Sequence, residues 1–182
     1  MNKLKYKVDK ILKNQLISVQ INLLNECTSR CKSCRRYTWP KDKLNLDDVK
    51  RIVNFLYDKY KIESILFSGG DPVCYDELDK VIKYCSSLGI HTACITTLIT
   101  EDEHIKDALA KTDRLFVSFD AFDKEKYKEV RGVDGSEVVK ENLRSLNALR
   151  KKNGKEKIRL SMTVGRLNLD QVEKVYAFCK EN

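Results

Sequence analysis

The sequence predicts an α/β fold, a partial (β/α) barrel with parallel strands and about five β/α units. Short apolar segments with strand-like patterns alternate with segments whose apolar residues recur at helical spacing. Regular alternation of this kind favours a parallel sheet with right-handed crossovers. The 182 residues are too few for the roughly 250 of a complete eight-unit barrel. Since no linker interrupts the pattern, we expect a single domain over residues 1–182.

Short apolar segments predict the strands, which we place at residues 17–23, 65–67, 90–96, 115–119 and 158–164. The helix after the first strand should begin at Asn45, because Asp48 follows three residues later in a capping-box-like arrangement. Its predicted apolar face consists of Val49, Ile52, Val53, Leu56 and Tyr60.

The later helices are placed by the same two signals, a cap and an apolar face. The second helix carries Leu78, Val81, Ile82 and Cys85 on one face and should stop at Gly89. Thr100 with Glu103 predicts the start of the third helix, and the fourth main helix should start near Ser136. Asn168 is predicted to cap the last helix, which carries Val172, Val175 and Cys179.

Charge and hydropathy exclude several classes of protein. The net charge is +8, but the lysines are scattered and no stretch interleaves arginine with exposed aromatic residues, so we do not expect a nucleic-acid partner. No apolar run approaches the length of a membrane span, and we expect no membrane association. The basic N-terminus lacks the apolar core of a secretory signal, which predicts a cytoplasmic protein.

The cysteines are the first sign of chemistry. Three of the seven, Cys27, Cys31 and Cys34, lie in a loop after the first predicted strand with the spacing C-x3-C-x2-C. Three thiolates on one short loop can ligate three irons of a cuboidal cluster, whereas a structural zinc site requires four ligands. The spacing therefore predicts an iron–sulfur site with one open position. We expect Cys85, Cys94 and Cys179 to be core residues.

Further polar clusters follow the other predicted strands. In parallel α/β folds the chemistry gathers in loops at the carboxyl ends of the strands. Glycines 69 and 70 remove side chains, so a ligand can approach the backbone there, and Pro72 stiffens the turn. The candidates at this edge are Ser68, Gly69, Gly70, Asp71, Pro72, Thr96, Thr97, Ser118 and Asp120. The sequence contains neither a phosphate-binding P-loop motif nor G-x-G-x-x-G.

The cysteine spacing after strand one, followed by the Gly-Gly-Asp-Pro loop after strand two, resembles the radical S-adenosylmethionine (SAM) superfamily. The resemblance runs from about residue 17 to the C-terminus. Residues 117–120 with Arg131 and Gly132, and residues 163–168, look most like the branch that contains the molybdenum-cofactor cyclase and the SPASM-type peptide-modifying enzymes.

The resemblance implies a radical SAM core in which the three cysteines ligate a [4Fe–4S] cluster. SAM would be cleaved reductively to methionine and a 5′-deoxyadenosyl radical, which abstracts hydrogen from a peptide or a small metabolite. A flavodoxin- or ferredoxin-like protein would donate the electron. The residues that the resemblance assigns to SAM are Gly69, Gly70, Asp71, Pro72, Thr96, Thr97, Ser118, Ser161 and Val164. One departure is Ser33, where the family usually has an aromatic residue.

Other readings stay open at this point. A non-catalytic iron–sulfur or electron-transfer module would need a fourth ligand, for which Cys74 is the best candidate. The family core has six β/α units and we count five, so a partner chain would cover the edge of strand five or the core would be truncated at its C-terminus. Arg131 could pair with a carboxylate or lie on the surface.

Overall fold

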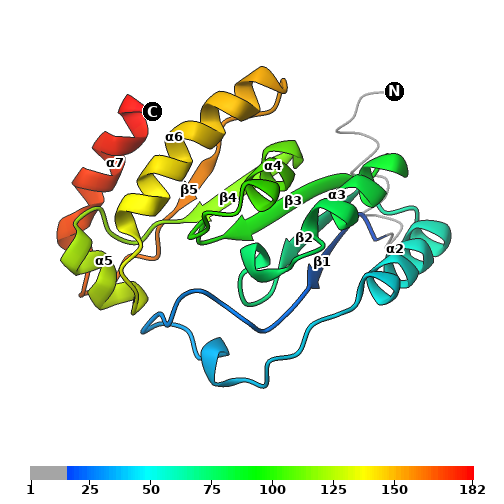
Figure 1. Ribbon diagram of the computed structural model, residues 1–182, viewed down its shortest axis with the longest axis horizontal. Helices are drawn as coiled ribbons and strands as arrows, with labels where there is room; N and C mark the ends of the chain where they lie inside the picture. Colours follow the sequence, from blue (N-terminus) through cyan, green and yellow to red (C-terminus); the bar gives the residue numbers. More distant parts are fainter. Residues whose placement is uncertain (1–15) are drawn as a thin grey trace.

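The computed structural model describes residues 16–182 and contains one parallel sheet in that part of the chain (Figure 1). The strand order is β1-β2-β3-β4-β5, and every neighbouring pair is parallel. The strands are β1 (Ser18–Asn22), β2 (Ser64–Ser68), β3 (His91–Thr96), β4 (Arg114–Ser118) and β5 (Arg159–Ser161). The predicted fold class, a partial barrel of five parallel strands, is confirmed, and the strands lie side by side in their sequence order.

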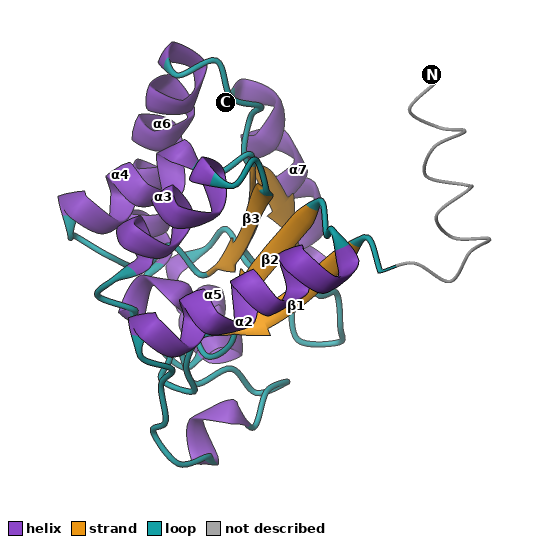
Figure 2. Cartoon of the chain, turned by 90° about the vertical axis from the view of Figure 1, so that its right-hand side faces the viewer, coloured by secondary structure: helices purple, strands orange, loops and turns teal. Residues whose placement is uncertain are grey.

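Each strand is joined to the next by one or more helices, as right-handed crossovers require. The α-helices are α2 (Leu46–Tyr60), α3 (Leu78–Ser87), α4 (Glu103–Lys111), α5 (Lys124–Arg131), α6 (Ser136–Lys152) and α7 (Val172–Glu181). Three single-turn helices are η1 (Arg36–Thr38), η2 (Pro72–Cys74) and η3 (Leu169–Gln171). Figure 2 shows the helices lying against the sheet, with the loop that carries η1 projecting below it.

The core lies between the helices and one face of the sheet. Alternate strand residues such as Ile65, Phe67, Cys94, Leu115 and Val117 are fully buried there, because successive side chains of a strand point to opposite faces. On the other face, described side chains such as Leu66, Ala93 and Phe116 are partly buried. They line part of a cavity of about 720 Å³ that lies toward the amino ends of the strands.

The local signals placed the starts of α2 and α6 correctly. The Asn45 side chain accepts a hydrogen bond from the Asp48 amide at 2.8 Å, which confirms the predicted cap of α2. On that helix Val49 and Val53 are buried, but Ile52 and Tyr60 are 37% and 38% exposed, so the buried face is narrower than predicted. All four predicted core residues of α3 are buried.

Four local predictions were wrong. Asp102, not Thr100, caps α4 by accepting from the amides of residues 104 and 105. Asn168 makes no capping hydrogen bond, because its side chain bonds to segments elsewhere. Strand β5 stops at Ser161, three residues earlier than expected. Cys179 is exposed, and Phe178 takes its place in the core.

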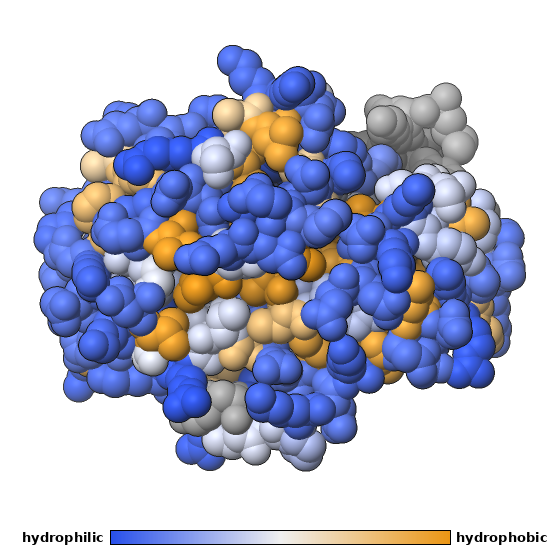
Figure 3. Space-filling model, in the orientation of Figure 1, coloured by the Kyte–Doolittle hydropathy of each residue, from blue (hydrophilic) through white to orange (hydrophobic). Residues whose placement is uncertain are grey.

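The surface agrees with the charged composition. Figure 3 shows hydrophilic residues over most of one face, with apolar residues visible between them. Among the residues that the structure describes, no helix is both long and apolar enough to cross a bilayer.

Candidate functional site

The loops after β1 and β2 lie directly against each other at the carboxyl edge of the sheet. We call residues 23–44 the cysteine loop and residues 69–72 the glycine loop. The amide of Gly70 donates to the Leu24 carbonyl at 2.6 Å, and the amide of Asp71 donates to the Glu26 carbonyl at 2.7 Å. The two predicted loops are therefore neighbours in the structure.

The two glycines make this contact possible. A Cβ atom at Gly70 would lie 1.9 Å from the Glu26 oxygen, and one at Gly69 would lie 2.4 Å from the Leu24 oxygen. Gly69 also has a φ of +138°, which side-chain-bearing residues rarely adopt. The sequence suggested that these glycines leave room for a ligand. The structure shows that the chain's own backbone occupies the space beside their α-carbons.

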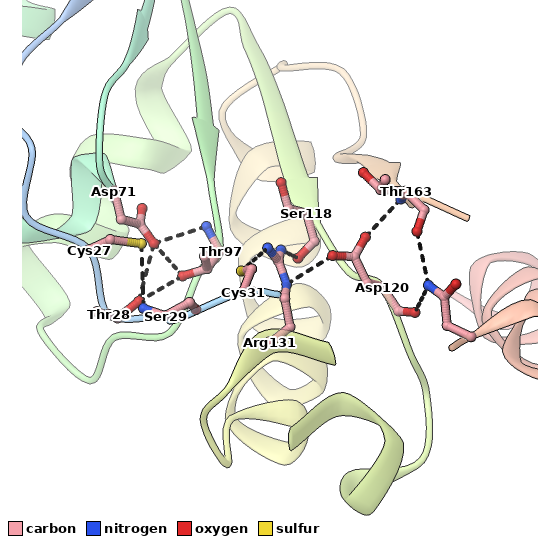
Figure 4. Close-up of polar contacts among 11 residues, drawn as sticks. Cys27, Thr28, Ser29, Cys31, Asp71, Thr97, Ser118, Asp120, Arg131 and Thr163 are labelled. Carbon is pink, nitrogen blue, oxygen red and sulfur yellow. Dashed lines mark hydrogen bonds and ion pairs between the residues drawn. The ribbon is translucent and has the colours of Figure 1, made fainter. Parts of the chain in front are cut away.

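The carboxylate of Asp71 ties the cysteine loop to the end of β3. It is 1% exposed and accepts from the Thr96 hydroxyl at 2.6 Å, from the Thr97 amide at 3.1 Å and from the Thr97 hydroxyl. The Thr28 hydroxyl of the cysteine loop donates to it at 3.3 Å and lies 3.0 Å from the Thr97 hydroxyl. Figure 4 shows the contacts of Thr28 and Thr97 with Asp71, beside Cys27.

The three loop cysteines differ in burial and in their partners. Cys27 is half-buried, Cys31 is buried and Cys34 is exposed. Backbone amides donate to two of the sulfurs, Ser29 to Cys27 and Arg36 to Cys34, each at 3.4 Å. The third sulfur, of Cys31, accepts from a guanidinium instead.

The loop cysteines do not form a site for a single ion in the described part of the chain. Among the described residues, no three Cys, His, Asp or Glu side chains are gathered closely enough to hold one metal ion. One zinc ion would require sulfurs at about 2.3 Å from a common centre. A cuboidal cluster takes each thiolate on a different iron, so it needs a wider triangle of sulfurs.

Burial raises the pKa of two thiols at the carboxyl edge of the sheet. It raises the pKa of Cys27 to about 11, with a further contribution from the Asp71 carboxylate. Cys74, the last residue of η2, has a pKa raised to about 12 by burial, by Asp71 and by Cys27. Metal ligation by Cys27 must therefore displace a proton, and it would be favoured by a cation that compensates the buried charge.

Arg131, at the end of α5, lies inside the site and not on the surface. Its side chain is 8% exposed, its Nη1 donates to Cys31 Sγ at 3.1 Å, and its Nη2 donates to the Ser118 carbonyl at 2.5 Å. Its Nε forms an ion pair with Asp120 Oδ2 at 3.2 Å, without the geometry of a hydrogen bond. Although burial lowers the pKa of Arg131, Asp120 and Cys31 outweigh that effect and raise it.

Asp120 connects this arginine to the segment after β5. Its second oxygen accepts from the Thr163 amide at 2.8 Å. The Asn168 side chain donates to the carbonyls of Asp120 at 2.7 Å and of Thr163 at 2.9 Å. Sequence reasoning missed this role of Asn168, because the local pattern of a cap accounted for the residue.

The remaining predicted residues are placed less closely together. Ser118 supplies its carbonyl to Arg131, and Ser161 is exposed at the end of β5. Val164 is 52% exposed and lines a cavity of about 250 Å³ together with Ser33 and Asp120. The larger cavity lies at the other end of the strands. We assign the site to the carboxyl edge, because the cysteines and their polar partners gather there.

The residues present fit an iron–sulfur cluster. The donor set is three thiols of one loop, and a buried guanidinium is available to one of them. The Ser29 hydroxyl, between the first two cysteines, is 2% exposed and has no hydrogen-bond partner among the described residues. A buried hydroxyl without a partner is costly, so its position suits a site that receives a further polar group.

Known proteins resemble this chain in sequence and in fold. The chain is 26% identical over 171 residues to a probable GTP 3′,8-cyclase of Methanothermobacter thermautotrophicus, covering 91% of this chain and 54% of that protein. It is 29% identical over 161 residues to an AdoMet-dependent heme synthase of Oleidesulfovibrio alaskensis, covering 85% of this chain and 40% of that protein. The chain thus spans about half the length of these relatives, or less.

Solved structures of SuiB from Streptococcus suis share the fold. With S-adenosylmethionine bound, SuiB superposes with a TM-score of 0.76 at 20% identity, over 98% of this chain and 40% of SuiB. SuiB has also been solved with its precursor peptide SuiA, with a TM-score of 0.75 at 19% identity and the same coverage. The model of the radical SAM superfamily matches residues 21–179 of this chain. The chain therefore belongs to the radical SAM superfamily, whose enzymes use a [4Fe–4S] cluster and SAM.

Proposed function

We propose that this chain is a radical SAM enzyme in which Cys27, Cys31 and Cys34 hold a [4Fe–4S] cluster. When bound, the cluster would supply one electron that breaks a carbon–sulfur bond of SAM, giving methionine and a 5′-deoxyadenosyl radical that abstracts hydrogen from the substrate. Three thiolates leave one iron without a protein ligand, and that iron would take the amino and carboxylate groups of SAM.

The observation that carries this proposal is the direct contact between the cysteine loop and the glycine loop. A ligand chelated next to the cysteines would also touch the glycine loop. Among the described residues, the carbonyls of Gly69 and Gly70 accept no hydrogen bond, whereas the amides of Gly70 and Asp71 already donate to the cysteine loop. Free carbonyls suit an ammonium group, which can only donate.

The other assignments to SAM follow the edge of the sheet. We propose that Asp71, Pro72, Thr96 and Thr97 shape the wall beside the methionine part, with Asp71 as their internal tie. Ser118 would lie near the ribose or the carboxylate. Residues 161–164 would border the adenine, because Val164 lines the small cavity beside the cysteine loop.

The substrate and the electron donor are proposed by class. SuiB has been solved with a precursor peptide, and the curated relatives are named for GTP cyclisation and heme synthesis. These names support a peptide or a small metabolite as substrate. The exposed cations Lys32 and Arg35 on the cysteine loop would favour an acidic flavodoxin- or ferredoxin-like donor. At the edge of β5, a partner chain or a sixth unit would pair with the strand.

Anaerobic reconstitution tests the proposal. The protein is loaded with iron and sulfide, reduced with dithionite and incubated with SAM, and 5′-deoxyadenosine is quantified. We expect 5′-deoxyadenosine and methionine in equal amounts from protein that carries a full cluster. If fully loaded protein forms neither product, this chain alone does not cleave SAM.

A further inference from the structure

The guanidinium of Arg131 reaches the sulfur of Cys31 from a helix 100 residues further along the chain. The same helix also holds the backbone on both sides of that cysteine. The Arg30 amide donates to the Arg131 carbonyl at 2.9 Å, and the Lys32 amide donates to the Val130 carbonyl at 3.0 Å. Cys31 is therefore the loop cysteine that the rest of the protein fixes most firmly.

The position of the guanidinium does not depend on the sulfur. Arg131 is also held by the Ser118 carbonyl, at the end of β4, and by the Asp120 carboxylate, in the loop that follows β4. Gly132 follows with a φ of +71°, and a Cβ there would lie 2.5 Å from the Arg30 oxygen. This close packing would keep the arginine beside Cys31 when the sulfur becomes an iron ligand.

Two opposite charges face each other next to this sulfur. The Arg131 side chain is 8% exposed and that of Asp120 is 5% exposed, so neither charge is screened by solvent. The Asp120 carboxylate cannot turn away, because its other oxygen accepts from the Thr163 amide. The buried Tyr127 hydroxyl is the further titratable group beside the pair. Arg131 is thus the single described cation that contacts a loop-cysteine sulfur directly.

We propose that Arg131 is a positioning residue that sets the reduction potential of the cluster through its hydrogen bond to Cys31, and that Asp120 moderates the effect of its charge. This inference rests on the proposed function, since it requires a cluster on Cys31. Hydrogen bonds to cluster sulfurs and nearby charge are among the determinants of such potentials. A donor cation favours the reduced cluster, which carries one more negative charge, and a buried anion disfavours it.

The two partners should therefore shift the potential in opposite directions. Arg131→Gln removes the cation and leaves Asp120 uncompensated, so we expect a lower potential, equivalent to at least a tenfold change in the reduction equilibrium, or about 59 mV for one electron. Asp120→Asn removes the anion and can still accept from the Thr163 amide, so we expect a higher potential. Arg131→Lys keeps the positive charge, so its potential should lie between that of Arg131→Gln and that of the wild-type protein.

The experiment is a mediated redox titration of reconstituted protein, with the reduced cluster followed by electron paramagnetic resonance and its content by iron and visible absorbance. Lys124→Gln is the matched control. It removes a cation from the same helix, but Lys124 pairs with Asp134 at an exposed position, so screening should leave the potential unchanged.

The outcomes separate this inference from the proposed function. Opposite shifts from Arg131→Gln and Asp120→Asn support it. Shifts of the same sign, or wild-type potentials in variants with full clusters, overturn it while leaving the proposed function intact. If Arg131→Gln takes up no cluster, the reduction potentials of Arg131→Lys and Asp120→Asn decide. Arg131→Lys leaves Asp120 unchanged, and Asp120→Asn leaves Arg131 unchanged. A wild-type protein that takes up no cluster overturns the proposed function and this inference together.

Discussion

Asp71→Asn tests whether hydrogen bonds to the Asp71 carboxylate hold the loops of the site together. Each carboxylate oxygen accepts from one backbone amide and at least one hydroxyl. One takes the Val73 amide and the Thr96 hydroxyl, and the other takes the amide and hydroxyl of Thr97 and the hydroxyl of Thr28. Asparagine has a single acceptor oxygen, so its NH2 group must face one of these sets of donors. One buried backbone amide is then left without an acceptor.

The structure sets the size of the expected effect. A buried amide without a partner costs about 1–3 kcal/mol, and replacing a charged acceptor by a neutral one costs roughly 1 kcal/mol more. We therefore expect Asp71→Asn to lower the free energy of unfolding by about 2–4 kcal/mol. Thr28→Val is the matched comparison, because it removes weaker contacts to the same group and should cost about 1 kcal/mol.

Equilibrium unfolding in urea, followed by circular dichroism without iron or SAM, measures both changes. A residue that served only as an acceptor for SAM would not affect stability under these conditions. If Asp71→Asn unfolds within about 0.5 kcal/mol of the wild-type protein, the hydrogen bonds to Asp71 do not organise the site.

Three further predictions concern Gly70, Asp113 and Cys74. Gly70→Ala should lower the free energy of unfolding in urea by at least about 2 kcal/mol, because its Cβ would lie 1.9 Å from a backbone oxygen. Gly165→Ala is the control and should be nearly neutral, because a Cβ there would have nothing within 4 Å. Equal costs for the two variants would contradict the loop packing. Burial raises the pKa of Asp113, but hydrogen bonds from Lys155 and from a backbone amide lower it below its ordinary value. The ionised Asp113 therefore stabilises the folded protein fully above its unfolded pKa, and this stabilisation is lost as the pH falls through its folded pKa. Asp113→Asn should flatten the acid limb of a curve of unfolding free energy against pH. An unchanged acid limb would contradict this. Cys74→Ala should leave the iron content unchanged, whereas loss of iron would favour a four-ligand electron-transfer module.

The edge where the site lies could be predicted because the signals are local. Strand periodicity placed the cysteine loop and the glycine loop after neighbouring parallel strands, and parallel strands present their carboxyl ends on one side. The contact between Glu26 and Asp71 then follows from topology. Cys85 and Cys94, which lie in periodic apolar segments, are buried as expected.

The rest depends on contacts between distant segments. Arginine is mostly exposed in proteins, so nothing local to Arg131 indicates that it is buried against Cys31. Asn168 precedes a helix and therefore looks like a cap, but its side chain donates to the carbonyl of Asp120, which lies 48 residues away in the sequence. Gly70 could be recognised as a place of close approach, yet only the fold shows that the approaching group is the chain itself.

The most direct test of the central claim is the visible absorbance of the reconstituted protein. Cys27→Ala, Cys31→Ala and Cys34→Ala are compared with Cys179→Ala, which removes an exposed cysteine outside the loop. The ligand assignment predicts that each loop variant loses the absorbance and the bound iron, while the Cys179 variant keeps both. A full cluster in any one of the three loop variants would contradict it.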